Sequence, residues 1–136
     1  MNRISEALAF QNVFAPQSVA ATTEKTTSYV DASGAREVAF LLSTAALGAN
    51  KSLTVTLLAA DDSGGSNAQE VDTAKFTDKE GTAPRVAVVT CRTSAAHGRY
   101  IAVKFQHDGD AEVVCGVLSA SDGAYLPAVN DWTLVV

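Results

Sequence analysis

Two histidines, His97 and His107, are the residues of this chain that could act as bases near neutral pH. His97 lies in a small polar stretch, residues 94–98, and His107 directly precedes an Asp108-Gly109 dipeptide. Nucleophilic catalysis needs a nucleophile, a base and an orienting group that converge, and no local motif such as Gly-x-Ser-x-Gly provides one. The sequence therefore predicts two solvated turn histidines, no catalytic residue and no enzyme.

Carboxylates gather between Asp61 and Glu80, where six acidic residues and two lysines give a local charge of −4. A calcium site would use several such oxygens, but the order of ligands typical of an EF-hand is absent. Paired-carboxylate hydrolysis needs acids fixed on a rigid cleft, whereas this region is rich in Gly and Ser. It is predicted to be a solvated loop without a metal, with ion binding kept as an alternative.

Two cysteines, Cys91 and Cys115, lie in strand-like runs and lack the Cys-x-x-Cys spacing of metal or redox sites. They are predicted to be buried thiols, and a disulfide between neighbouring strands is the alternative. Glycine-rich phosphate-binding motifs are also missing, because Gly64-Gly65 is not followed by the P-loop residues. No cofactor is predicted.

The composition and charge of the chain argue against two classes of binding partner. The 136 residues carry 10 basic and 15 acidic side chains, a net charge of −5, which argues against binding to nucleic acid through phosphates. No apolar run approaches the roughly 18 residues that span a membrane. The first residues do not read as a signal peptide, since Glu6 interrupts the apolar stretch. We therefore expect a protein made in a cytoplasm, with neither nucleic acid nor membrane as its partner.

Alternating apolar and polar residues dominate the middle of the chain and predict an all-β protein. Residues 37–43, 52–60 and 99–106 alternate, and the nearly continuous apolar run 85–92 is typical of a strand buried on both faces. Turn residues separate these runs, so the expected fold is an antiparallel β-sandwich or jelly-roll-like barrel of about 6–8 short strands. The expected organisation is an N-terminal arm (1–26), a β domain (27–120) and a C-terminal tail (121–136).

One local signal predicts a specific pairing. Asp108-Gly109 favours a type I′ turn, in which both central residues take positive φ. The flanking runs, residues 100–106 and 111–119, are therefore expected to pair as an antiparallel hairpin.

The order of strands and turns resembles the small head decoration, or cement, proteins of tailed bacteriophages. The resemblance covers about residues 27–119 and rests on patterns rather than chemical motifs. These patterns are the Thr-Ser-Tyr-Val-Asp run of residues 27–31 followed by Gly34, the predicted strands 38–42 and 53–57, the acidic loop 61–64, and the predicted strand pair 99–105 and 111–114. It implies a capsid-stabilising virion protein, assembled in the host cytoplasm, that binds the outside of the head. The implied partner is the major capsid protein, and the implied state is a homo-oligomer, a dimer or trimer.

Apolar side chains near both ends fit such a role, because segments of this kind can become ordered on a partner. The last residues, which hold the one Trp of the chain, are expected either to pack on the body, the favoured alternative, or to dock on a neighbour. The predicted partner contacts are Phe10, Phe14, Trp132, Leu134 and Val136.

Two other functions are kept as alternatives. A sandwich with long polar loops, especially residues 61–67, is also typical of a carbohydrate- or receptor-binding module displayed on a virion. A head–tail connector or tail component is the third possibility, since these proteins are β-rich too.

Overall fold

The computed structural model describes residues 3–93, 98–123 and 128–136, so the prediction for His97 lies outside the described residues. Within these described residues, the fold consists of one short helix and nine strands. They are α1 (Ile4–Ala7), β1 (Ala9–Val19), β2 (Lys25–Thr26), β3 (Val30–Asp31), β4 (Ala35–Thr44), β5 (Lys51–Ala60), β6 (Gln69–Asp78), β7 (Arg85–Arg92), β8 (Tyr100–His107) and β9 (Val113–Gly123).

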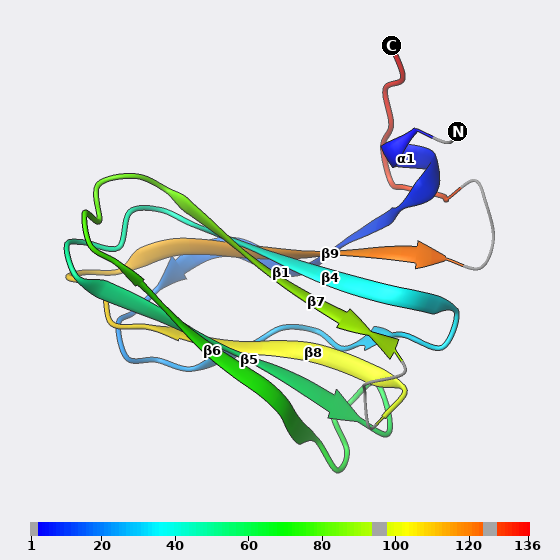
Figure 1. The fold of residues 1–136 in the computed structure, drawn as a ribbon, viewed down its shortest axis with the longest axis horizontal. Coiled ribbons are helices and arrows are strands. Elements are labelled where there is room, and N and C mark those ends of the chain that lie inside the picture. Colours follow the sequence, from blue (N-terminus) through cyan, green and yellow to red (C-terminus); the bar gives the residue numbers. More distant parts are fainter. Residues whose placement is uncertain (1–2, 94–97, 124–127) are drawn as a thin grey trace.

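The strands form two antiparallel sheets that pack face to face (Figure 1). One sheet has the order β1-β9-β4-β7, and we call it sheet A. The other, sheet B, has the order β2-β8-β5-β6, with β3 also paired to β8. The predicted β-sandwich is therefore confirmed, with nine strands where six to eight were expected.

Alternation along the central strands builds the core between the sheets. On β4 the side chains of Val38, Phe40 and Leu42 are buried, and on β8 Ile101 and Phe105 are buried as well. Inward residues of β5 and β9 complete the layer: Leu53, Val55, Leu57, Cys115 and Val117. These are the faces that a period of two predicts for half-buried strands.

The expected hairpin at Asp108-Gly109 is wrong. β8 belongs to sheet B and β9 to sheet A, so the turn connects the two sheets, and neither residue has positive φ. Hydrogen bonds explain the difference: the backbone N–H of Ser52 donates to Asp108 Oδ1 at 2.6 Å, and that of Gly109 donates to His107 Nδ1 at 3.0 Å. These contacts hold the turn against β5 and the buried His107 rather than closing a hairpin.

Part of the expected N-terminal arm is a strand. β1 lies at the edge of sheet A and pairs with β9 along its length. Pro16 hid this strand from sequence reasoning, because proline cannot donate to a ladder and is confined to edges and bulges. The register shifts on both sides of Phe14, the second of them spanning Pro16, are consistent with that rule. The domain boundaries at residues 26 and 120 stay a prediction.

The two other edges also differ from expectation. β6 is a ten-residue strand, although most of residues 61–80 was expected to be loop. β7 has the predicted bounds, but it is an edge strand of sheet A, with Val86 and Val88 exposed, rather than a strand buried on both faces. No helix in the described part of the chain is long and apolar enough to cross a membrane.

Candidate docking surface

His107 is buried rather than solvated, so the expectation of an exposed turn histidine is wrong. Its Nδ1 accepts a hydrogen bond from the backbone N–H of Gly109, so Nε2 carries the proton and donates to the carbonyl oxygen of Val19 at 2.6 Å. The ring thereby links the end of β8 to the end of β1. With its side chain fully buried, His107 has a structural role and no access to a substrate.

The two cysteines are free and buried, as the sequence predicted. Both belong to sheet A, where Cys91 lies opposite Val38 and Cys115 opposite Thr44 of the same strand, β4. Six residues of strand separate these positions by about 20 Å, far beyond the reach of a disulfide. Burial raises the pKa of the Cys91 thiol and raises that of Cys115 to about 11, so neither is a reactive thiolate.

The acidic region is divided between a loop and an edge strand. In the loop, Asp62 Oδ1 accepts hydrogen bonds from the backbone N–H groups of Gly64 and Ser66, and hydrogen bonding to Ser66 lowers the pKa of the Asp62 carboxyl. At the end of β6, Asp78 pairs with Arg85 at 2.9 Å, which lowers the pKa of Asp78. No cluster of three His, Cys, Asp or Glu residues suited to a metal occurs among the described residues.

The outer side of sheet A carries a different kind of surface. We call it the apolar outer face and define it by Phe10, Leu41, Val86, Val88 and Leu118. Leu41 lies opposite Val88 on one neighbouring strand and opposite Leu118 on the other, so three strands contribute one row. Val86 and Val88 are more than half exposed, and Leu118 and Phe10 are about two-fifths exposed. A contiguous exposed apolar patch of this kind is typical of a protein–protein contact.

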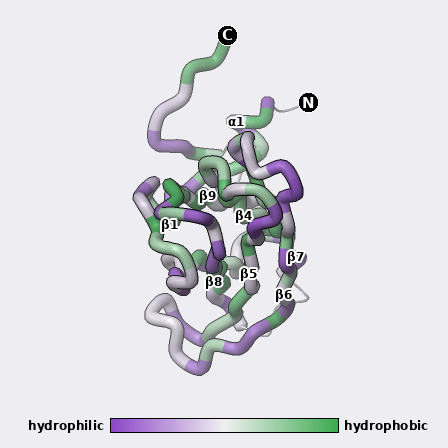
Figure 2. The backbone as a smooth tube through the Cα atoms, turned by 90° about the vertical axis from the view of Figure 1, so that its left-hand side faces the viewer, coloured by the Kyte–Doolittle hydropathy of each residue, from purple (hydrophilic) through white to green (hydrophobic). Residues whose placement is uncertain are grey.

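The C-terminal residues lie beside this face and project from the two sheets (Figures 1 and 2). Asn130 is their anchor: its Nδ2 donates to the carbonyl oxygens of Ser5 and Leu8, and its Oδ1 accepts from the backbone N–H of Phe10 at 2.7 Å. Beyond it, residues 131–136 form no strand. The favoured alternative, a last strand packed on the body, is therefore not what the described residues adopt.

Four of the five predicted partner contacts come together at one groove of about 690 Å³, between the C-terminal residues and sheet A. Trp132 and Leu134 line it with side chains that are 97% and 88% exposed, and Phe10 lies at its rim. Phe14 also lines the groove, but its ring packs edge-on against Phe105 of the core, with centroids 5.1 Å apart. Val136 is fully exposed outside the groove. Contact of these residues with a partner stays a prediction.

Comparisons with known proteins identify the fold and no family. No protein-family model matches the sequence, and no curated protein matches it. Among solved structures, the PBSX exported protein XepA matches with a TM-score of 0.59 and 10% identity, over 100% of this chain and 44% of that one. The infectious bursal disease virus VP2 subviral particle matches with a TM-score of 0.55 and 10% identity, over 86% and 32% of the two chains.

A further match is the T13 viral particle of the same virus, with a TM-score of 0.53, 14% identity, and 89% and 34% of the chains covered. The chain thus spans less than half the length of each of these three proteins. Their sandwich is the one seen here, and at such identities the likeness concerns the fold alone.

Sequence reasoning missed most of the apolar outer face. Leu41, Val86, Val88 and Leu118 each stand in an ordinary strand pattern, and nothing local distinguishes an outward apolar residue from an inward one when both faces carry them. The signal lies in sheet order, which places three such residues side by side. Only Phe10 was identified from the sequence.

Proposed function

We propose that this chain is a structural virion protein that binds the outer surface of a phage capsid and stabilises it by cross-linking capsomers, without catalysis. The partner is the major capsid protein, contacted through the apolar outer face of sheet A. The observation that carries the proposal is this face, an exposed apolar row across three strands with no charged side chain in it.

The energetics of such a contact are those of ordinary apolar burial. Each large side chain of the face that is removed from water contributes about 1.5–3 kcal/mol when fully buried. A decoration protein is present in many copies, so modest contacts per copy add up over the shell. The net charge of −5 and the acidic edge at β6 keep the opposite side of the molecule solvated.

Support from the comparisons is coarse. The same sandwich occurs in viral particles of infectious bursal disease virus and in a PBSX exported protein. That likeness is consistent with a virion role and says nothing about position on a head. A fold shared by unrelated proteins does not by itself specify function, so the proposal depends on the face.

The test is co-sedimentation of the protein with purified phage heads. We expect the wild type to sediment with the heads and Leu118→Lys to bind at least about tenfold more weakly, because a buried, unpaired ammonium opposes docking. Thr54→Lys, which adds the same charge on the exposed side of β5 in sheet B, is the matched control and should bind like the wild type. Equal binding by both variants would exclude sheet A as the docking face.

A further inference from the structure

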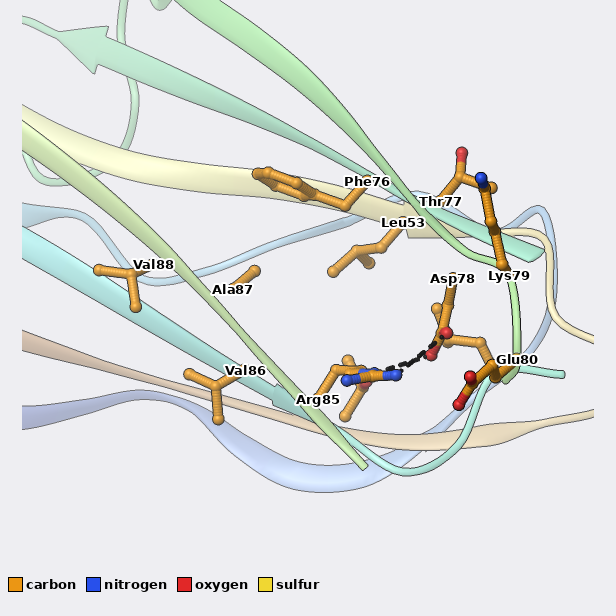
Figure 3. Close-up of a pocket in the computed structure, with 12 residues that line it drawn as sticks. Leu53, Phe76, Thr77, Asp78, Lys79, Glu80, Arg85, Val86, Ala87 and Val88 are labelled. Atoms are coloured by element: carbon orange, nitrogen blue, oxygen red, sulfur yellow. Dashed lines mark hydrogen bonds and ion pairs between the residues drawn. The ribbon is translucent and has the colours of Figure 1, made fainter. Parts of the chain in front are cut away.

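A second apolar groove lies between β6 and β7 and is lined by residues of both strands. We call it the seam and define it by Leu53, Phe76, Val86, Ala87 and Val88. Figure 3 shows Phe76 and Leu53 on one side of the opening and the β7 residues on the other. Its volume is about 500 Å³, and the Asp78–Arg85 ion pair lies at one end.

The seam contains a buried polar group without a partner. Thr44, at the end of β4, lines it and is only 3% exposed, and its Oγ1 has no hydrogen-bond partner within the described residues. Buried hydroxyls are normally paired, so an unpaired one marks a place where an incoming group completes the bonding. The seam therefore holds apolar side chains that are open to solvent and one buried hydroxyl without a hydrogen-bond partner among the described residues.

The β7 edge is also the sheet edge with the fewest protective features. β1 carries Pro16 and two register shifts, β6 carries charges along its length, and β2 and β3 are two residues each. In β7 the charges are confined to the ends, Arg85 and Arg92, and the residues between them are uncharged. A long uncharged edge of this kind accepts an additional strand.

The C-terminal residues 131–136 have the pattern of such a strand. Trp132, Leu134 and Val136 alternate with Thr133 and Val135, and these three side chains are 97%, 88% and 102% exposed. In an extended chain they would all lie on one face. The segment therefore has the pattern of an apolar strand but is paired with no strand among the described residues of its own chain.

Residues 131–136 cannot lie as a strand in the seam of their own chain. Asn130 is bonded at Phe10, and the register of sheet A places Phe10, Ala120, Ala39 and Thr90 in one row, three strand spacings or about 14 Å across. On β7 the seam begins at Val88, two residues or roughly 7 Å along the strand from Thr90, and a strand added at the free edge of β7 lies one further spacing away, about 19 Å from β1. Trp132 is two residues from the anchor, which allows it about 7 Å.

We propose that residues 131–136 of one copy bind in the seam of a second copy, as an added strand antiparallel to β7. With Asp131 beside Arg92, residues of opposite charge meet, Leu134 lies beside Val89 and Val136 beside Ala87. Ala87, Val89 and Cys91 face the core, so this register turns all three large side chains toward the core: Val136 enters the seam beside Ala87, and Trp132 lies beside Cys91, farther along β7.

This association is head-to-tail, because the segment and the seam are different surfaces of the molecule. Such contacts build rings when the rotation closes and chains when it does not. The inference goes beyond the proposed function, since self-association requires no capsid and can be measured on the isolated protein.

Trp132 is the one tryptophan of the chain, so its fluorescence reports on the contact directly. We expect the wild type to sediment as a monomer at low concentration and as larger species at high concentration, with a blue shift of the emission as the indole leaves water. Phe76→Lys in the seam should weaken association by about tenfold or more. Val114→Lys, an exposed valine of sheet A two strands away from β7, is the matched control and should associate like the wild type.

Mixing two defective variants tests the head-to-tail geometry. Trp132→Ser/Leu134→Asp removes the segment and the fluorophore, while Phe76→Lys blocks the seam and keeps both. Each should be monomeric alone, and the mixture should form a complex of two chains with blue-shifted emission. If Phe76→Lys proves unfolded by circular dichroism, Val88→Lys replaces it. Exposed-tryptophan emission at every concentration, association of the segment variant with itself, or no shift in the mixture would overturn the proposal.

Discussion

At the scale of residues, two of the polar side chains considered for chemistry have structural roles. His107 joins β8 to β1, and Asp62 closes its own loop. Sequence reasoning placed His107 in a solvated turn because it precedes Asp-Gly. The local sequence gives no sign of the distant carbonyl oxygen of Val19 that accepts a hydrogen bond from the ring. The acidic residues were interpreted as a solvated loop, which omits the strand β6, and the histidine was interpreted by its neighbours alone.

The cysteines allow a prediction at this scale. Cys115 is fully buried and its pKa is raised to about 11 by burial, so its thiolate is scarce and inaccessible at pH 8. We expect iodoacetamide to leave Cys115 unmodified in the folded protein and to alkylate it once the chain is unfolded in urea. Mass spectrometry of the digested protein measures this, and rapid alkylation of Cys115 in the native state would contradict its placement in the core.

A second prediction at the scale of residues concerns the thermal stability of the protein at low pH. The hydrogen-bonded ion pair with Arg99 lowers the pKa of Asp31, so the folded state holds this carboxyl charged more strongly than the unfolded state does. Its contribution is present above the usual pKa of about 3.9 and is lost as pH falls through the lower folded value. We expect wild type to melt above Asp31→Asn at pH 7 and the gap to narrow below about pH 4. A gap that does not change with pH would rule out the ion pair as its source.

At the scale of elements, the alternation of apolar and polar residues predicted the strands whose inward side chains form the core. β4 and β8 bury mainly one face, and β5 buries residues on both faces. All three were found with nearly correct bounds, because their inward apolar residues recur with a period of two. β6 was missed as a full strand because it is exposed on both faces and therefore has no such pattern. The false hairpin at Asp108-Gly109 has the same origin, since turn propensity cannot report which sheet receives the next strand.

The connection between β6 and β7 provides the prediction at this scale. Gly81 has a φ of +66°, and a Cβ there would collide with the backbone of Gly48. Gly81→Ala should therefore lower the free energy of unfolding by more than about 1 kcal/mol. Gly34→Ala is the control, because a Cβ there meets nothing within 4 Å, and it should change stability by less than about 0.5 kcal/mol. Urea unfolding measures both, and equal effects would contradict the close approach of the two loops.

At the scale of the whole molecule, the sandwich carries three surfaces with different chemistry, two of which share Val86 and Val88. The outer side of sheet A is apolar, the β6 edge is charged, and the seam opens between β6 and β7. The sequence predicted the sandwich, but it favoured packing of the last residues on the body, whereas Trp132, Leu134 and Val136 are exposed. It could not predict the apolar outer face, because that face arises from the order β9-β4-β7 and not from any one strand.

The central claim is that the protein reinforces a capsid from outside, and the thermal rupture of purified phage heads tests it most directly. Heads stripped of the protein are heated with and without the protein added back, and release of DNA is followed by a dye. The account predicts that added protein raises the rupture temperature and that Leu118→Lys, at the same concentration, raises it less. Equal rupture temperatures with and without wild-type protein would contradict the account.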